Sequence, residues 1–281
     1  MKAILLPTDF SKNSINAINY AMELYKDVPC VFYILNVQKT SSFISDDIMV
    51  ANASATIYNT IVDAAKKSIT NIIIKIKARY NNENHQFKTI VDYDNFVDSI
   101  NQVSKRYKID LIVMGTKGAS GLKKVLFGSN TVHAIKRSKV PVLAIPDHCK
   151  FSGLEKIAFT TSFKRLYKKD DFNLLSSMVS LNYSKLYVLH VVCDNAYSDE
   201  LNNGIDFFKL NFKYPIFKYM QVNDNNIYKA VHEFTTTNAI KMIAMTVNKY
   251  SFFERLFNKH AFENMAYDID IPFLVMKNSQ N

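Results

Sequence analysis

Glycine is concentrated in one segment of the chain, and the pattern of that segment could bind a phosphate. Four of the six glycines among the 281 residues lie between Gly115 and Gly128. Glycine serves where the backbone must turn sharply or approach another group closely. Residues 110–114 before it predict a buried strand, and residues 130–139 after it predict a helix. A strand, a glycine loop and a helix in this order present backbone N–H groups to a phosphate.

The spacing of these glycines differs from the common nucleotide motifs. Gly115, Gly118, Gly128 and Ser129 form the pattern Gly-x2-Gly-x9-Gly-Ser, which is neither a P-loop nor a Rossmann fingerprint. Gly115 and Gly118 would turn N–H groups outward, and the helix that begins near Gly128 would attract phosphates by its free N–H groups and its dipole. The Ser129 hydroxyl and the Asn130 N–H would add donors. Two alternatives stay open, a tight loop without a ligand and a Ser129 that caps its helix.

The chain contains a degenerate internal repeat. Four pairs of segments match: 3–11 with 156–163, 31–37 with 185–191, 112–114 with 243–245, and 140–143 with 271–274. The offset between the copies shortens along the chain, so the second copy has lost residues in its middle. Duplication of one ancestral unit is the simplest explanation.

Each copy alternates short apolar strands with helical stripes. In the first copy the expected strands are 3–6, 31–37, 88–91, 110–114 and 140–145, and the expected helices are 14–25, 49–80, 96–107 and 130–137. This alternation predicts an α/β fold with a doubly wound parallel sheet that is covered on both faces. Such sheets bind ligands beyond the carboxyl ends of their strands, where both Asp9 and the glycine loop are expected.

Three segments resemble the universal stress protein family. They are the glycine pattern, the opening Pro7-Thr8-Asp9-Phe10-Ser11, and Ser138-Lys139-Val140-Pro141-Val142-Leu143. The resemblance covers all of the first copy and, without the glycines, the framework of the second. It implies two flavodoxin-like, adenine-nucleotide-alpha-hydrolase-like domains in tandem, at 1–146 and 151–281. Their last strands, 140–145 and 271–276, would pair antiparallel and form an intramolecular pseudo-dimer.

The resemblance also implies a ligand and a site. The ligand is ATP, or AMP or ADP, in the N-terminal domain, with Mg²⁺ on the phosphate oxygens. The implied site residues are Pro7, Asp9, Val37, Met114, Gly115, Gly118, Gly128, Ser129 and Asn130. Asp9 would meet the adenosine through its carboxylate and Val37 through its backbone, although Asp9 as a helix cap and Val37 as a core residue remain alternatives. The second copy has Ser162 for Asp9 and Thr246 for Gly115, so no nucleotide, or a weaker one, is expected there.

Catalysis has little support in the sequence. Paired carboxylates, a Cys/His couple, a Gly-x-Ser-x-Gly elbow and a His-x-x-Glu-His helix are all missing. A nucleotide held without a base that positions water hydrolyses slowly, so at most weak ATP hydrolysis is expected. The leading expectation is a stress-response protein that senses or regulates through bound ATP, by a population shift. The alternative is a nucleotide-free interaction scaffold with a vestigial glycine loop.

Composition indicates a cytoplasmic globular protein. No apolar run is long enough to span a bilayer, the N-terminus lacks a signal peptide, and the three cysteines are widely spaced. The net charge is +10, but no basic window carries interleaved aromatics, so neither a membrane nor a nucleic acid is expected as a partner. Besides the adenine nucleotide, a homodimer of tandem chains and a protein partner are expected. The aromatic-rich segment 207–219 either fills the core or forms an interaction surface.

Overall fold

The computed structural model describes residues 1–38, 48–116, 127–163, 166–192, 199–222, 227–247 and 270–277, and for 48–58, 192, 199–200 and 227–228 it describes the backbone alone. The chain divides into two compact units. Among the described residues, the first unit holds 1–38, 48–116 and 127–140, and the second begins at Pro141.

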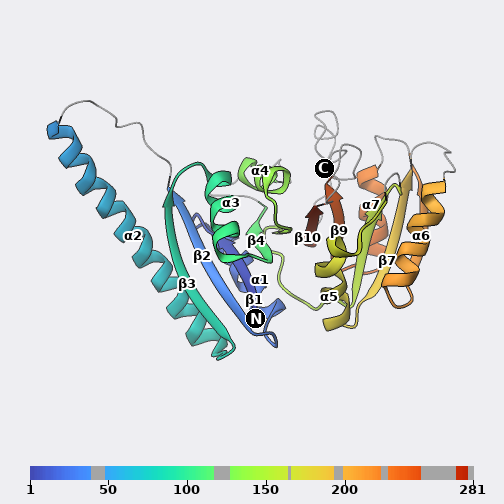
Figure 1. Ribbon diagram of the computed structural model, residues 1–281. Helices are drawn as coiled ribbons and strands as arrows, with labels where there is room; N and C mark the ends of the chain where they lie inside the picture. Colours follow the sequence, from blue (N-terminus) through green and yellow to red (C-terminus); the bar gives the residue numbers. More distant parts are fainter. Residues whose placement is uncertain are drawn as a thin grey trace. The chain divides into compact units, whose positions relative to one another are not determined.

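The first unit is a four-stranded parallel sheet with helices between its strands (Figure 1). Its elements are β1 (Lys2–Pro7), α1 (Lys12–Leu24), β2 (Cys30–Gln38), α2 (Ile48–Tyr80), β3 (His85–Tyr93), α3 (Phe96–Tyr107), β4 (Leu111–Gly115) and α4 (Ser129–Arg137). The strand order is β3-β2-β1-β4, and β1 pairs in parallel with both β2 and β4. The chain moves from β1 outward to β3 and then returns to the other side of β1. The gap between β1 and β4 is therefore the switch point at which such sheets bind ligands.

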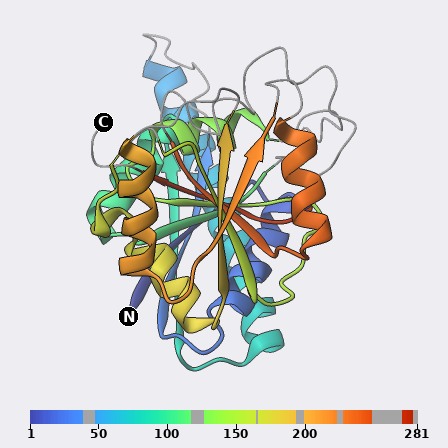
Figure 2. The ribbon, with the colours of Figure 1, turned by 90° about the vertical axis from the view of Figure 1, so that its right-hand side faces the viewer.

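The second unit repeats this arrangement with more strands. Its elements are β5 (Val142–Ile145), β6 (Lys156–Thr161), the 3₁₀ helix η1 (Lys169–Phe172), α5 (Asn173–Leu181), β7 (Lys185–Val192), α6 (Asp199–Asn211), β8 (Ile216–Gln221), α7 (Ile227–Thr237), β9 (Met242–Val247) and β10 (Phe273–Lys277). The strand order is β5-β10-β9-β6-β7-β8. Figure 2 views this unit from its β8 edge and shows α5 and α6 on one face of the sheet and α7 on the other.

The predicted antiparallel pairing of the last strands is confirmed. β10 pairs antiparallel with β5, with Phe273 opposite Ala144 and Val275 opposite Val142, while the other pairs recorded in this sheet are parallel. By packing, β5 belongs to the second unit. The domain limits 1–146 and 151–281 follow the sequence repeat and stay a prediction.

Continuous burial explains the sequence of the central strands. β4 is buried along its whole length, and so are Ile4–Pro7 of β1 and Ile157–Thr161 of β6, because helices cover both faces of a doubly wound sheet. The edge strand β3 is longer than the predicted 88–91, since its alternating exposed Gln86 and Lys88 break the apolar pattern. In the part of the chain that the structure describes, no helix is both long and apolar enough to cross a membrane.

The aromatic-rich segment 207–219 does two things. Phe208 and Phe212 are buried, and Phe208 packs against Phe159 and Phe172 with ring centroids 5.1 and 5.5 Å away. Tyr214 and Tyr219 are instead exposed. The segment therefore fills the core with one part and presents a surface with another.

Candidate functional site

The carboxyl ends of β1, β2 and β4 bring together several of the residues predicted from the sequence. Pro7 ends β1, Met114 and Gly115 end β4, and Val37 lies one residue before the end of β2. These ends adjoin, because β1 lies between β2 and β4 in the sheet. The predicted Gly118 lies outside the described residues.

The turn after β1 is fixed by a small polar network. Phe10 has a left-handed backbone with φ of 65°, which is costly for a residue other than glycine. Its N–H donates to Thr8 Oγ1 at 3.0 Å, and the Asn36 side-chain amide donates to the Thr8 carbonyl at 2.8 Å. Asp9 is exposed, and its Oδ1 accepts the Ser11 N–H at 3.1 Å. The turn thus sets the position of an exposed carboxylate at the carboxyl edge of the sheet.

Two helices of the first unit begin with a side-chain cap. Ser11 caps α1 by accepting the Ser14 N–H at 3.2 Å. Asn95 caps α3 by accepting the Val97 N–H at 3.0 Å. The capping of α1 therefore comes from Ser11 and not from Asp9. Each cap satisfies one of the N–H groups that a helix leaves without a partner in its first turn.

α4 differs from both of these helices. It begins after Gly128, which carries no acceptor, and no side chain caps it among the residues that the structure describes. Gly128 has φ of −68° and ψ of 160°, a conformation that any residue adopts. The turn therefore does not require glycine, and the absence of a side chain is the property that distinguishes this position. Among the described residues, none accepts a hydrogen bond from the first-turn N–H groups at exposed Ser129 and Asn130, which suits these groups to solvent or to a ligand.

The N-terminus of α4 is tied to the end of β4. Thr131 Oγ1 donates to the carbonyls of Gly115 and Thr116, at 2.9 and 3.2 Å, and the Gly128 N–H donates to the Thr116 carbonyl at 2.6 Å. These bonds are buried at Thr131. The uncapped helix end is thereby held beside the strand ends that carry the other predicted residues.

Gly115 has a packing reason for being glycine. A Cβ built there would lie 2.8 Å from Cγ and Oδ1 of Asn13, in the first turn of α1, and 3.1 Å from the Asn13 carbonyl carbon. Real Cβ atoms do not approach other atoms so closely, so α1 contacts β4 only because Gly115 lacks a side chain. From its sequence context, Gly115 was expected only to give a phosphate access to the backbone.

Three residues that organise the site were missed from the sequence. Asn13 fills the space beside Gly115, Asn36 holds the turn after β1, and Thr131 anchors α4. Asn36 could have been found, since it is a polar residue in the otherwise apolar run 30–37 and is only 3% exposed. The roles of the other two depend on tertiary contacts that leave no local pattern.

The second unit has the same turn with a different outcome. Phe163 after β6 has φ of 53°, and its N–H donates to Thr161 Oγ1 at 2.8 Å, as Phe10 does to Thr8. Thr161 Oγ1 also bonds the hydroxyl of Tyr167. The repeat found in the sequence therefore extends to the backbone of this turn.

The Phe163 ring fills space at the carboxyl ends of the strands in the second unit. It is 1% exposed, and its ring lies 5.0 Å from that of His190 and 6.2 Å from that of Phe208. A Cβ at Gly204 on α6 would come within 2.0 Å of Phe163 Cδ1, so this glycine makes room for the ring. His190 stands at the repeat position of Asn36, and burial lowers its pKa, which a hydrogen bond to the Ser162 backbone partly offsets. Aromatic rings thus fill the region where the first unit has a polar turn.

The ionisable groups do not form a metal centre among the described residues. No group of three or more His, Cys, Asp or Glu side chains that could hold an ion is found there. Burial raises the pKa of both the Cys30 and the Cys149 thiols to about 11, so each is protonated at neutral pH and is a poor nucleophile. Cys193 lies outside the described residues.

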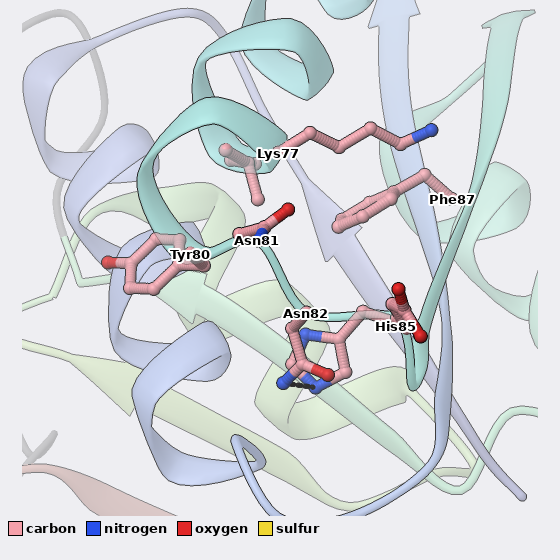
Figure 3. Close-up of a pocket in the computed structure, with 8 residues that line it drawn as sticks. Lys77, Tyr80, Asn81, Asn82, His85 and Phe87 are labelled. Carbon is pink, nitrogen blue, oxygen red and sulfur yellow. Dashed lines mark hydrogen bonds between the residues drawn. The ribbon is translucent and has the colours of Figure 1, made fainter.

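A cavity of about 380 Å³ lies at the opposite edge of the first unit, between the end of α2 and the start of β3 (Figure 3). Lys77, Tyr80, Asn82, His85 and Phe87 are among the residues that line it. His85 Nε2 lies 2.9 Å from the Tyr25 carbonyl oxygen, which can only accept, so this nitrogen carries a hydrogen and donates a hydrogen bond to that oxygen. None of the residues predicted for the nucleotide site lines this cavity.

Comparison with known proteins places the chain in a family. The family model described as the universal stress protein family matches residues 1–146. The chain belongs to the universal stress protein family. It is 28% identical over 144 residues to the universal stress protein MJ0531 of Methanocaldococcus jannaschii, covering 51% of this chain and 81% of that protein. It is 27% identical over 158 residues to the universal stress protein MJ0577 of the same organism, covering 51% and 94%.

Solved structures of this family extend the likeness to the whole chain. A universal stress protein from Archaeoglobus fulgidus matches with a TM-score of 0.63 and 18% identity, covering 98% of this chain and 96% of that one. A putative universal stress protein from Pseudomonas aeruginosa matches with a TM-score of 0.62 and 10% identity, covering 99% and 94%. Both likenesses concern the fold: they confirm the α/β prediction, and a tandem arrangement is consistent with them.

Proposed function

We propose that this universal stress protein binds an adenine nucleotide, ATP in the first instance, at the carboxyl edge of its first unit. The observation that carries the proposal is the uncapped N-terminus of α4, held beside β4 by Thr131. The other helices of this unit with described caps, α1 and α3, use a Ser and an Asn side chain. A helix that keeps its first N–H groups open at the switch point of a parallel sheet is suited to an anionic ligand.

The residues present fit such a ligand. The phosphates would accept from the N–H groups of the first turn of α4 and from the Ser129 hydroxyl. The adenosine would lie toward Asp9, whose exposed carboxylate suits a ribose hydroxyl, and toward the backbone of Val37. Pro7, Met114 and Gly115 would line the floor of the site at the ends of β1 and β4.

Mg²⁺ would be held mainly by the phosphates. A magnesium ion keeps several water ligands and is commonly bound by one or two carboxylates together with substrate phosphates. This role does not need a preformed cage of protein side chains. Bound Mg²⁺ would neutralise part of the negative charge of the phosphates.

We expect regulation rather than turnover. Hydrolysis needs a group that positions the attacking water, and the proposal assigns none, so at most weak ATP hydrolysis is expected. ATP would act by favouring one state of the protein through contacts that the other state lacks. A cytoplasmic location and association of two chains belong to the same proposal.

A nucleotide-free scaffold is the second candidate. The contact between Gly115 and Asn13 favours it, because that contact explains one glycine of the motif without any ligand. The candidate does not explain why Gly128 leaves α4 uncapped in a backbone conformation open to any residue.

Mass spectrometry of the native protein separates the two candidates. The chain purified without added nucleotide and kept under native conditions is expected to carry a mass increment of AMP, ADP or ATP. Denaturation should release that increment. A native mass equal to that of the bare chain, together with a flat calorimetric titration with Mg-ATP, would favour the scaffold.

A further inference from the structure

Two neighbouring turns of the second unit each present an exposed tyrosine. Tyr183 lies between α5 and β7 and is 92% exposed, and Tyr214 lies between α6 and β8 and is 84% exposed. β7 and β8 pair in parallel with Tyr187 opposite Ile216, so the two turns that lead into these strands lie next to each other. Figure 2 shows both turns at the lower end of this unit.

Leucines accompany the tyrosines. Leu181, at the end of α5, is 53% exposed, and Leu210, near the end of α6, is 84% exposed. These two turns supply four of the eight large apolar side chains that are highly exposed among the described residues. A concentration of this kind marks an interaction surface more often than scattered exposed residues do.

Burial within the chain does not account for the two tyrosines, and the contact found for Tyr214 is with the Lys213 amino group, 5.7 Å from the centre of its ring. Both have left-handed backbones, with φ of 50° at Tyr183 and 53° at Tyr214. Glycine and asparagine adopt this conformation at the lowest cost. In the first unit the turn that corresponds to that of Tyr214, between α2 and β3, has Asn81 with φ of 41°, and the turn after α3 has Lys108 with φ of 49°. The second unit therefore bears a backbone cost for side chains that bury almost nothing within the chain.

A row of lysines follows the same edge. Lys156 and Lys185 are the first residues of β6 and β7, Lys241 directly precedes β9, and Lys213 precedes β8. These strands are consecutive in the order β9-β6-β7-β8, so their starts are about 5 Å apart. Within the described ranges none of the four lysines forms an ion pair, and Lys185 and Lys213 are exposed. The half-buried Lys156 and Lys241 donate from Nζ to the Asn238 carbonyl at 2.8 Å and to Ser152 Oγ at 3.2 Å.

The first unit lacks this pattern. The residues that precede its strands include Asp27, Glu83 and Asp110, so acidic and basic groups alternate at the corresponding edge. Among the described residues, the corresponding edge of the first unit thus has a mixed charge, whereas the second unit combines lysines with four exposed apolar side chains.

We propose that this tyrosine–lysine edge (Leu181, Tyr183, Leu210, Tyr214, Lys156, Lys185, Lys213 and Lys241) docks the protein peripherally on an anionic lipid surface. Lysines near a bilayer are attracted by acidic headgroups. Tyrosine favours the membrane–water interface, and leucine inserts its apolar carbons below the headgroups. Side chains that protrude from two turns can insert into a fluid lipid surface, which needs no preformed pockets to receive them.

This inference revises the expectation that no membrane takes part. That expectation rested on the absence of a spanning segment and of a basic sequence window with aromatics, and a docking edge assembled from separate turns needs neither. A single-stranded nucleic acid is the rival occupant, since its bases could stack on the tyrosines and its phosphates meet the lysines. It gives no role to Leu181 and Leu210, so the lipid surface accounts for more of the edge.

Sedimentation with lipid vesicles tests the proposal on the full chain. The protein should pellet with vesicles of phosphatidylcholine and phosphatidylserine and stay in solution with phosphatidylcholine alone, and added salt should release it. Equal binding to both vesicles, or to neither, would overturn the proposal. Retention of an oligothymidine strand by a protein that ignores the acidic vesicles would assign the edge to nucleic acid instead.

The double variant Tyr183→Asn/Tyr214→Asn separates docking from folding. Asparagine suits the left-handed backbone, so the melting temperature should stay equal or rise, while the vesicle partition coefficient should fall by about tenfold or more through the lost apolar contact. The variant Lys185→Gln/Lys213→Gln should lower it by about fivefold for each lysine removed. Ile74→Asn, at an exposed apolar residue of α2, is the matched control and should leave the vesicle partition coefficient unchanged. Full vesicle binding by the tyrosine variant would contradict the proposal.

Discussion

The two units build the same turn after their first strand and use it differently. Phe10 and Phe163 share a left-handed backbone and a bond from their N–H to a threonine hydroxyl. Phe10 is half-buried beside a polar network, whereas Phe163 is fully buried among rings and fits only because Gly204 lacks a side chain. The two turns thus share one backbone conformation, while different side chains leave the first carboxyl edge polar and fill the second with aromatic rings.

The first prediction concerns what each phenylalanine contributes to stability. Phe163→Ala should lower the free energy of unfolding by about 3–5 kcal/mol, because it leaves a cavity in an aromatic core. Phe10→Ala should cost less than about 1.5 kcal/mol, because a half-buried ring loses less apolar burial. Chemical denaturation followed by circular dichroism measures both. Equal losses at the two positions would show that the units do not differ as described.

The second prediction concerns the open end of α4. Gly128→Asp places a carboxylate where the phosphates are proposed to bind, so it should cap the helix and lower Mg-ATP affinity by about 100-fold, given the several kcal/mol that like charges cost. The melting temperature should not fall. Asn95→Asp, which adds the same charge at the cap of α3, is the control and should leave nucleotide affinity intact. Undiminished ATP binding by Gly128→Asp would remove α4 from the site.

The third prediction concerns pH and is the smallest in effect. Burial lowers the pKa of His190 in the folded state, so the unfolded chain binds more protons as the pH falls below 6.5. The stability of the second unit should therefore decrease as the pH falls from neutral through that range, and His190→Gln should flatten the decrease. Melting curves of both proteins across this range provide the measurement. A His190→Gln variant with the same pH dependence as the parent protein would show that another group is responsible.

Much of the fold could be predicted from the sequence because buried strands leave continuous apolar runs. The repeat identified 140–143 and 271–274 as corresponding last strands, and the family resemblance implied that these strands pair, as β5 and β10 do. The edge strand β3 was underestimated, since a strand with one exposed edge mixes polar residues into its pattern. In the second unit, buried Phe212 and exposed Tyr214 are two residues apart in a turn, where neither the helical nor the strand period applies.

The sequence indicated which residues end the strands and begin α4, but it did not give the physical reasons for them, and their role in a site stays a prediction. The glycine spacing placed the end of β4 and the start of α4 correctly on the chain. Position 115 is glycine because Asn13 approaches it closely, and glycine at position 128 leaves α4 without a side-chain cap. Both reasons arise from contacts between elements that are far apart in sequence. Residue types can indicate where a ligand is expected, but they do not show which neighbour takes up each vacant space.

The stoichiometry of nucleotide binding tests the central claim most directly. Calorimetric titration of Mg-ATP into the full chain, stripped of copurified nucleotide, should saturate at one nucleotide per chain, because Phe163 and its neighbours fill the edge of the second unit. Saturation at two per chain would contradict the claim that the units have diverged in this way. An absence of binding would contradict the claim that the open end of α4 receives a phosphate.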